Sequence, residues 1–366
     1  MLIPPDSLTD DRPPLVDLLG LAEGRPGSVL LIRPSALGDV VRTVPLVVSL
    51  RRRFPALAID WLVQDSFVDA VRAHPGVRAA VPFPRGLFRR WFSPPAAMAV
   101  GRWVRTLARA NYDLVIDAQG LARSGALARA TGAAIRVGLD DAREMGWLGY
   151  THRVKPREGV VHTVDRMLAL VEALGATPIR DLRLVAPPED RTAAERDAVL
   201  AGRFAVLAPT SRWPGKRWPI ERFAALATLL LEHGLVERVV VVGAGSEREE
   251  CRPLLELAQR EERVVDRLGR TCVGGLMATI ERAALVVAND SAALHIAVGM
   301  GRPLVALFGP TDVAKVGPYG RDGDVLQVLR PGDRYDHKDE ALGRAMMARI
   351  ELDAVIDAAR VRLSAG

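Results

Sequence analysis

The chain has 366 residues, a length that suits two domains, each large enough to bury its own core. Hydrophobic residues make up 49% of it, which excludes an intrinsically disordered protein, and no apolar run is long enough for a transmembrane helix. The net charge of +6 favours acidic partners. We expect no nucleic acid among them, because the sequence has no helix-turn-helix, zinc or RNP signature.

The positive charge is concentrated in the first half, at Arg51 to Arg53 and in RGLFRRW at residues 85–91. A solvated arginine-rich surface is the plain alternative to a binding role. The two cysteines, Cys251 and Cys272, are too few for a disulfide framework. One bridge is the alternative to free, buried thiols in a reducing compartment, which we expect. Residues 1–27 begin acidic and proline-rich, without the pattern of a signal peptide, and are expected to form an extension before the first strand.

Apolar runs typical of buried strands alternate with helical patterns along most of the chain, which indicates parallel sheets with right-handed crossovers. In the first half the expected strands are residues 29–33, 59–63, 80–83, 114–118 and 135–138, with helices at 40–54, 67–73, 96–110 and 122–130. In the second half the expected strands are residues 205–208, 238–243, 264–267, 285–288 and 304–308.

A proline- and charge-rich segment after a helix at residues 163–174 marks the domain boundary. We therefore predict two Rossmann-like domains, 28–176 and 191–338, joined by a linker at 177–190. The last segment, 339–366, carries a helical stretch at 340–363 that is expected to pack back toward the N-terminal domain. In such a pair the ligand cleft lies between the carboxyl ends of the two sets of strands.

The first candidate motif is RPSALGDVVRTVP at residues 33–45, where a buried strand runs into a loop and then a helix. Gly38 permits a tight turn, and Asp39 stands at the entry to the helix. Asp39 alone is expected to cap the helix. A carboxylate at this position over a cleft is also suited to act as a general base.

The second motif is APTSRWPGKRWP at residues 208–219. The hydroxyls of Thr210 and Ser211 and the ammonium of Lys216, at the carboxyl end of a strand, suit a diphosphate. The alternative is an exposed basic loop anchored by tryptophans. In the third motif, VVVVGAGSEREE at residues 239–250, Glu247 accepts ribose hydroxyls or merely favours a helix N-terminus. Its GAG string is a weak dinucleotide fingerprint.

The fourth motif, LVVANDSAALHIAVGMGRPLVALFGPTD at residues 285–312, is the most informative. It reads as a strand, a small-residue helix and a second strand, and such a unit holds phosphorylated ligands at its helix N-terminus. Asp290, Ser291 and His295 supply polar groups there, beside the next strand end at Gly309–Thr311. Asp290 alone suggests a cap and His295 alone a core histidine, but their combination favours a functional site.

Together these strings resemble glycosyltransferase family 9, the ADP-heptose:lipopolysaccharide heptosyltransferases. The resemblance covers residues 29–320 and is carried by IRPSALGDVVRTVP, VIDAQGLARSGALAR, GKRWP and the NDSAALHIA…LFGPTD block. GKRWP, the Gln119–Gly120 string and DAREMG at residues 141–146 are similar to the type I enzymes in particular. One departure is Ala292, where the family usually has glycine.

The resemblance implies an α/β GT-B fold whose two parallel sheets face each other across a cleft, with an acceptor-binding N-terminal domain and an ADP-heptose-binding C-terminal domain. It makes Asp39 the general base of an inverting transfer. The implied donor-binding residues are Thr210, Ser211, Lys216, Glu247, Asp290, Ser291, Ala292, His295, Gly309 and Thr311. The expected acceptor-facing residues are Ser35, Gly38, Arg51, Arg52, Gln119 and Arg143.

We expect no obligatory metal or cofactor, since no Asp-x-Asp string stands in a metal-binding setting. The expected acceptor is an anionic glycolipid, either Kdo-lipid A or a heptosyl core, and Arg51–Arg53 with residues 88–92 are expected to rest on an anionic membrane surface. The enzyme would then be a cytoplasmic monomer attached peripherally to the inner membrane. The alternatives are another glycan or protein acceptor, a nucleotide-sugar epimerase or hydrolase, and a nucleotide-sugar-binding protein without activity.

Overall fold

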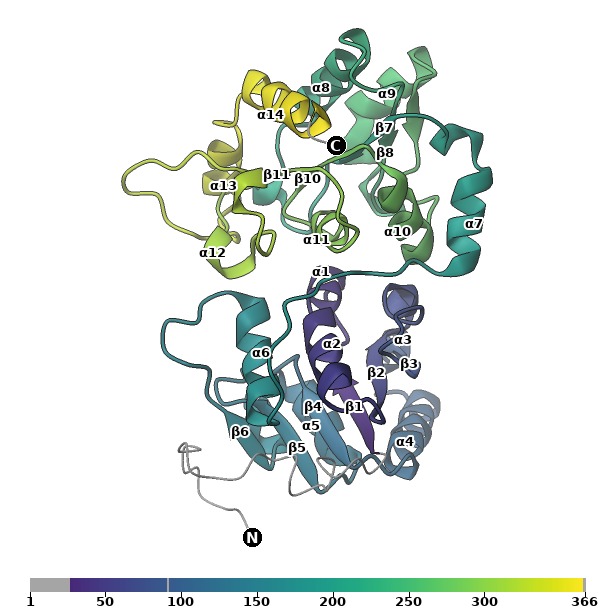
Figure 1. The fold of residues 1–366 in the computed structure, drawn as a ribbon, viewed down its shortest axis with the longest axis vertical. Coiled ribbons are helices and arrows are strands. Elements are labelled where there is room, and N and C mark those ends of the chain that lie inside the picture. Colours follow the sequence, from purple (N-terminus) through teal and green to yellow (C-terminus); the bar gives the residue numbers. More distant parts are fainter. Residues whose placement is uncertain (1–26, 91, 365–366) are drawn as a thin grey trace. The chain divides into compact units, whose positions relative to one another are not determined.

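The computed structural model describes residues 27–90 and 92–364 (Figure 1). The chain divides into two compact units, Met1–Leu182 and Arg183–Gly366. The division falls within the predicted linker, although helix α7 already begins at Pro188. The expected N-terminal extension, apart from residue 27, lies outside the described residues, as does Trp91 of the arginine-rich stretch.

The first unit is built on a six-stranded, wholly parallel sheet in the order β3-β2-β1-β4-β5-β6. Its central strand β1 is buried from Val29 to Ile32, as the continuous apolar run predicts. The strands are β1 Ser28–Ile32, β2 Ala58–Gln64, β3 Ala79–Phe83, β4 Leu114–Asp117, β5 Ile135–Leu139 and β6 His152–Val154. The helices are α1 Leu37–Val41, α2 Val44–Arg53, η3 Asp65–Ala70, α3 Arg85–Phe88, α4 Pro94–Arg109, α5 Ala122–Ala130, η4 Gly146–Gly149 and α6 Thr163–Ala173.

The second unit repeats this plan with a parallel sheet in the order β12-β11-β10-β7-β8-β9. Its strands are β7 Phe204–Ala208, β8 Arg238–Val241, β9 Val264–Asp266, β10 Leu285–Asn289, β11 Leu304–Leu307 and β12 Val325–Leu326. Its α-helices are α7 Pro188–Arg196, α8 Ile220–Glu232, α9 Arg252–Arg260, α10 Val273–Arg282, α11 Ala292–Gly299, α12 Val313–Val316, α13 Glu340–Met347 and α14 Leu352–Ser364. Its 3-10 helices are η5 Ala198–Leu200, η6 Pro214–Lys216, η7 Gly245–Glu247, η8 Glu249–Cys251 and η9 Asp322–Asp324.

Both sheets share the strand order of the dinucleotide-binding folds, in which the order reverses beside the first strand. The reversal lies between β1 and β4 in the first unit and between β7 and β10 in the second. Ligands of open α/β sheets bind at the carboxyl ends of the strands at such a switch point. The first motif follows β1, the second follows β7, and the fourth begins with β10, so all three lie at a switch point.

The predicted α/β class with two Rossmann-like parallel sheets is confirmed, and each predicted strand lies within two residues of an observed one. The short edge strands β6 and β12 were not predicted. The predicted helix at residues 40–54 is two helices, because the chain turns at Arg42–Thr43 and Pro45 stands in the first turn of α2. The cleft expected between the sheets stays a prediction.

Packing of the C-terminal helix back toward the N-terminal domain stays a prediction. The predicted stretch is two helices, α13 and α14, and α14 packs on α8, β10 and β11 of its own unit. The reason is apolar burial: Val355, Ile356, Ala359 and Leu363 of α14 belong to the second unit's hydrophobic core.

The expectation for the cysteines is borne out in part. Cys251 and Cys272 are both free, but only Cys251 is buried. Within the described ranges, no helix is long and apolar enough to cross a lipid bilayer.

Candidate active site

Asp39 lies in the first turn of α1, directly beyond the carboxyl end of β1. It is not the N-cap, which is Ala36. Instead, Oδ2 of Asp39 accepts the N–H of Ala36 at 3.3 Å and so closes the first turn. Asp39 therefore has the helix-stabilising role that its position alone predicts, while Oδ1 is used by other groups.

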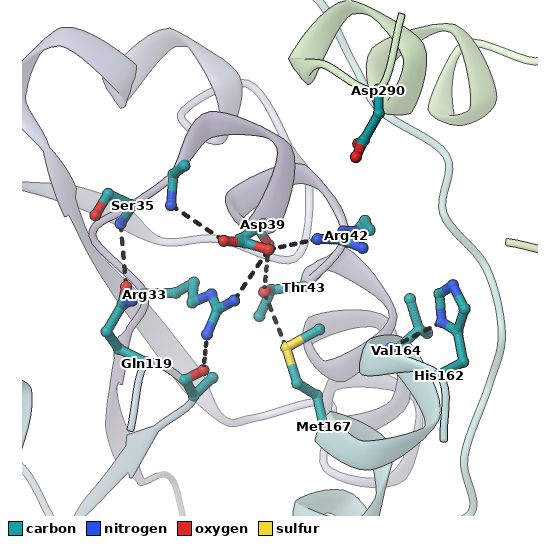
Figure 2. Close-up of polar contacts among 12 residues, drawn as sticks. Arg33, Ser35, Asp39, Arg42, Thr43, Gln119, His162, Val164, Met167 and Asp290 are labelled. Atoms are coloured by element: carbon teal, nitrogen blue, oxygen red, sulfur yellow. Dashed lines mark hydrogen bonds and ion pairs between the residues drawn. The ribbon is translucent and has the colours of Figure 1, made fainter. Parts of the chain in front are cut away.

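Two guanidinium groups meet on Oδ1 of Asp39 (Figure 2). Nη2 of Arg42 lies 2.5 Å from this oxygen and Nη2 of Arg33 lies 3.3 Å from it. Burial alone would raise the pKa of Asp39, but the charges of Arg33 and Arg42 outweigh burial and lower the pKa to about 2. The carboxylate is thus ionised throughout the physiological pH range and is a weak base.

The end of β4 fixes the position of Arg33. Nη1 of Arg33 donates to the carbonyl oxygen of Ala118, which follows β4. The next residue, Gln119, accepts the N–H of Ser35 on its Oε1 at 3.2 Å (Figure 2). The loops that follow β1 and β4 are therefore joined in two places beside Asp39.

The loop after β4 is organised by Asp117, whose side chain is almost fully buried. Its Oδ1 accepts the N–H groups of Gln119 at 2.8 Å and Gly120 at 3.1 Å, and its Oδ2 accepts the hydroxyl of Tyr150 at 2.7 Å. Burial raises the pKa of Asp117, and these hydrogen bonds oppose that rise. This carboxylate thus holds the Gln119 loop against the sheet, a role that its sequence position did not reveal.

The structure brings together only some of the expected acceptor-facing residues. Ser35, Gly38 and Gln119 lie at the carboxyl edge of the first sheet, and the exposed Arg143 joins them because its N–H donates to the carbonyl oxygen of Gly120 at 2.9 Å. Arg51 and Arg52 do not join them, since they lie in the last turn of α2, at the opposite edge of the sheet.

Arg51 has a structural role at that opposite edge. Its Nη1 donates to the carbonyl oxygens of Pro55 at 2.5 Å and Leu57 at 2.6 Å, just before β2 begins. Helix α2 runs through ten residues, about 15 Å, away from the edge that carries Asp39, so Arg51 and Arg52 are not part of that site, and their contact with an acceptor stays a prediction.

In the second unit, three predicted residues meet where β7 and β10 end. Nζ of Lys216 lies 2.6 Å from Oδ2 of Asp290, and the two side chains are only 14% and 10% exposed. The hydroxyl of Ser211 donates to the main-chain carbonyl oxygen of Asp290 at 2.8 Å. The second and fourth motifs thus form one site at the switch point of this sheet.

Thr210 and Glu247 extend this site toward β8. The hydroxyl of Thr210 donates to Oε2 of Glu247 at 2.7 Å, and the same oxygen accepts the N–H of Ala244 at 2.7 Å. The structure thus supports the helix-terminus role that was one alternative for Glu247. Contact with a ribose stays a prediction.

Two buried hydroxyls of the fourth motif, those of Ser291 and Thr311, have no hydrogen-bond partner among the described residues. Ser291 is the N-cap of α11, but its side chain accepts no capping bond. Buried hydroxyls are almost always paired in native proteins, so these two have hydrogen-bonding capacity for a ligand rich in oxygen. His295 lies buried on α11, and whether it touches that ligand stays a prediction.

Two amide side chains, the buried Asn289 and the half-buried Gln327, hold the loops of this site. Nδ2 of Asn289 donates to the carbonyl oxygen of Pro209 at 2.6 Å, and its Oδ1 accepts the N–H of Trp218 at 3.1 Å. Nε2 of Gln327 donates to the carbonyl oxygens of Gly309 at 2.8 Å and Thr311 at 3.0 Å. Asn289 could have been found from its place beside Asp290, whereas nothing near Gln327 in the sequence marks it.

Comparison with known proteins decides the family. Residues 100–341 match the sequence model of glycosyltransferase family 9 (heptosyltransferase). The chain belongs to glycosyltransferase family 9. Lipopolysaccharide heptosyltransferase 1 of Pseudomonas aeruginosa is 32% identical over 300 residues, which are 80% of this chain and 81% of that protein.

The Escherichia coli K12 protein of the same name is 29% identical over 310 residues, 82% of this chain and 94% of that one. The solved structure of E. coli heptosyltransferase WaaC with ADP-2-deoxy-2-fluoro heptose superposes with a TM-score of 0.72 at 26% identity, over 90% of this chain and 98% of that one. The predicted family and glycosyltransferase class are therefore confirmed.

The structure explains how this family 9 chain carries Ala292 where glycine was expected. Ala292 is the first residue of α11, and its φ is not positive. Among the described residues other than glycine, only Asn111, Glu144 and Met145 have a positive φ. Its backbone therefore needs no glycine, because helical φ and ψ are open to any L-residue.

Helix α13 supports two loops at the switch point of the second sheet, those that carry Lys216 and Thr311. A Cβ on Gly343 would lie 2.4 Å from the carbonyl oxygen of Gly215, so the glycines let α13 approach the turn that carries Lys216. A Cβ on Gly309 would lie 2.7 Å from Sδ of Met347, so α13 also packs against the loop before Thr311. Sequence reasoning missed this brace because nothing local links residue 343 to residue 215.

Proposed function

We propose that this protein transfers a heptose from ADP-heptose to a hydroxyl of a lipopolysaccharide inner-core acceptor, Kdo-lipid A or a heptosyl core, with inversion at the anomeric carbon. The observation that carries the proposal is the group formed by Lys216, Asp290 and Ser211 at the switch point of the second sheet, beside the unpartnered hydroxyls of Ser291 and Thr311. The names of the curated relatives support the transferred sugar and the acceptor class, and the solved WaaC structures with ADP-2-deoxy-2-fluoro heptose and with ADP support the donor.

The donor diphosphate binds at the carboxyl ends of β7 and β10. Lys216 supplies a positive charge, the hydroxyls of Ser291 and Thr311 donate to phosphate oxygens, and the free N–H groups at the start of α11 add donors and a favourable dipole. When the sugar leaves, the diphosphate gains negative charge at a place arranged to receive it. Glu247 lies in η7, beyond the end of the neighbouring strand β8, where the nucleoside is expected.

Asp39 is the general base of the proposed reaction. The acceptor oxygen forms a bond to the anomeric carbon while the bond from that carbon to the diphosphate breaks, ADP departs, and the proton passes to the Asp39 carboxylate. A carboxylate with a pKa of about 2 is too weak to remove this proton beforehand. Proton transfer is therefore late and coupled to departure of ADP, while Arg33 and Arg42 keep the carboxylate ionised and oriented.

The charge that leaves with ADP is neutralised by Lys216 and by α11, so the proposed transfer needs no metal. A transfer rate retained in excess EDTA is the expected result. Complete loss of the rate, restored by Mg²⁺ alone, would show that a metal takes the role given to Lys216.

The deciding experiment incubates the purified protein with ADP-heptose and Kdo-lipid A and follows the glycolipid by mass spectrometry. Addition of one heptosyl residue, with an inverted anomeric linkage by NMR, is expected. Donor consumption without acceptor would instead indicate an epimerase or hydrolase. Transfer only to an acceptor that already carries heptose, to another glycan or to a protein would correct the acceptor and leave the donor assignment standing.

The proposed acceptor is anchored in a membrane and the donor is water-soluble, so we propose that the enzyme works as a cytoplasmic monomer at the inner-membrane surface. Fractionation of cells, followed by a high-salt wash of the membranes, tests the location: a peripheral protein is released by salt. Light scattering of the purified protein tests whether it is a monomer. A mass well above the 39.6 kDa of one chain would show that it is not.

A further inference from the structure

The segment from residue 85 to residue 110 has a charge unlike any other part of the chain. It contains six arginines and no aspartate or glutamate, so it alone carries a charge equal to the +6 of the whole protein. The arginines are Arg85, Arg89, Arg90, Arg102, Arg105 and Arg109. The structure forms α3 and α4 from this segment, beside the edge strand β3 (Figure 1).

An aromatic cluster fixes α3 against α4 and the sheet edge. The ring of Phe88 lies 4.7 Å from that of Phe83 and 5.4 Å from that of Trp103, measured between centroids. Phe83, Phe88 and Trp103 pack on or within the hydrophobic core of the first unit. Because this inner side of the two helices is apolar, the arginines are left on the outer side, where all six are exposed.

The outer side also exposes large apolar side chains. Phe92 is 77% exposed and Met98 is 63% exposed, the two highest values among the large hydrophobic residues that the structure describes. We call Phe92, Met98 and the six exposed arginines the α3–α4 surface. Exposed apolar groups beside a cationic surface indicate a partner that is itself amphipathic.

Within residues 27–90 and 92–364, no acidic side chain forms an ion pair with any of these six arginines. Arg85 donates to Oε1 of Gln64, and Arg105 to the carbonyl oxygen of Gly101. Some exposed arginines on other helices are paired, since Arg344 lies 2.7 Å from Glu340 and Arg360 lies 3.0 Å from Asp357. Others, such as Arg123 and Arg129 of α5, form no ion pair among the described residues. The α3–α4 surface differs in that six such arginines come from one segment without a single acidic residue.

We propose that the α3–α4 surface docks the protein on an anionic lipid bilayer, with the arginines against the headgroups and Phe92 and Met98 inserted among them. Arginine stems cover apolar surface while their charged ends stay at the headgroups, which suits this composition. The exposed phenylalanine and thioether favour a bilayer over duplex DNA, whose phosphate backbone is bound mainly through charge. This inference deepens the proposed function by naming its membrane-facing surface.

The structure also narrows the surface expected from the sequence, which included Arg51 to Arg53. Arg51 is committed to the carbonyl oxygens of Pro55 and Leu57, and the guanidinium carbon of Arg53 lies 5.0 Å from the ring centroid of Phe54. Docking is therefore assigned to α3 and α4 and not to the end of α2.

Co-sedimentation with vesicles tests the proposal without donor or acceptor, so its result is separate from transfer activity. The full chain is mixed with vesicles of phosphatidylethanolamine and phosphatidylglycerol, or of phosphatidylcholine alone. We expect binding to the anionic vesicles, little to the neutral ones, and release at about 0.5 M NaCl, where surface charges are screened. Equal binding to both vesicles, or binding to DNA but not to either vesicle, would overturn the proposal.

Two variants test separately how much the arginines and the apolar side chains contribute to vesicle binding. R102Q/R105Q/R109Q should weaken binding by roughly 100-fold, at about fivefold for each arginine. F92S/M98S should weaken binding while leaving its salt dependence in place. R196Q/R252Q/R260Q removes the same charge from exposed positions in the second unit and should bind like wild type.

Thermal unfolding and ADP binding of each variant confirm that it is folded. If R102Q/R105Q/R109Q and its control lose binding equally, the attraction is a property of net charge and the α3–α4 surface is not the docking site. Turnover of a delipidated, soluble acceptor should be unchanged in R102Q/R105Q/R109Q and in F92S/M98S. Absence of turnover in the wild type with intact vesicle binding would count against the proposed reaction and not against docking.

Discussion

Nζ of Lys216 lies 2.6 Å from Oδ2 of Asp290, although the two residues come from different loops of the second unit. The ammonium has three donors, so it can hold this carboxylate and still bind a phosphate oxygen. Asp290 thus keeps Lys216 extended at the end of β10, where the donor diphosphate is proposed to bind.

We predict that Lys216→Ala lowers the affinity for ADP by roughly 10- to 100-fold, because a hydrogen bond to a charged group contributes about 1.5–3 kcal/mol. Isothermal titration calorimetry with ADP measures the loss. Lys155→Ala, which removes an exposed lysine from the first unit, is the control. Unchanged affinity in Lys216→Ala would leave Lys216 as a structural partner of Asp290 only.

Asp39→Asn should reduce turnover by about 10²- to 10⁴-fold, the usual contribution of a general base. ADP affinity should persist, since the residues proposed to bind the donor lie in the second unit. The chain offers a matched control in Asp69, which also pairs with an arginine three residues on and has the same 28% side-chain exposure. If Asp69→Asn loses as much turnover as Asp39→Asn, the effect is one of helix structure.

The pH dependence of turnover follows from the pKa of Asp39, which the charges of Arg33 and Arg42 lower to about 2. The carboxylate is ionised above that pH, so Asp39 should give kcat/KM no acid limb between about pH 5 and 8. Arg42→Gln removes one of the two charges, and because burial raises the pKa, the acid limb should move upward in this variant. A limb near neutrality in the wild-type profile, unmoved in Arg42→Gln, would assign the titration to another group.

The same pKa makes a prediction for acid stability. Because the folded pKa lies below the ordinary value of 3.8, ionised Asp39 stabilises the fold above about pH 4, and this contribution is lost as the pH falls toward 2. Urea unfolding at a series of pH values should show a smaller loss over this window in Asp39→Asn than in the wild type. Equal losses in both would mean that other carboxylates dominate acid unfolding.

Much of the fold and the placement of the motifs could be predicted from the sequence, because buried strands leave continuous apolar runs and parallel strands end at a common edge. Asp39, Ser211, Lys216 and Asp290 were found from their position at strand ends. The ion pairs of Arg33 and Arg42 with Asp39 could not be predicted, since they depend on the conformation of two long side chains. This ion pairing decides how basic the carboxylate is, and the general-base role of Asp39 stays a prediction.

The brace formed by α13 lay beyond sequence reasoning for a different reason. A helical pattern at residues 340–363 shows that a helix forms, but not which surface its apolar face covers. The decisive contact is between Gly343 and Gly215, where each lacks a side chain so that two backbones can approach. In a sequence, a glycine within a helix indicates only a low helix propensity at that position. Its contact partner, Gly215, is far away in the sequence.

Gly343→Ala tests whether this approach positions Lys216. The added Cβ would lie 2.4 Å from the carbonyl oxygen of Gly215 and 2.7 Å from its Cα, and backbone atoms cannot yield as a flexible side chain does. We expect destabilisation of about 1–3 kcal/mol, as for other overpacked sites, and with it a weaker affinity for ADP, because Lys216 follows Gly215 directly. Differential scanning calorimetry and ADP titration measure the two effects. Gly323→Ala is the control, since its Cβ would meet no atom within 4 Å and Gly323 is not among the glycines with positive φ. A loss of stability with unchanged ADP affinity would show that α13 supports the fold of the second unit without setting the position of Lys216.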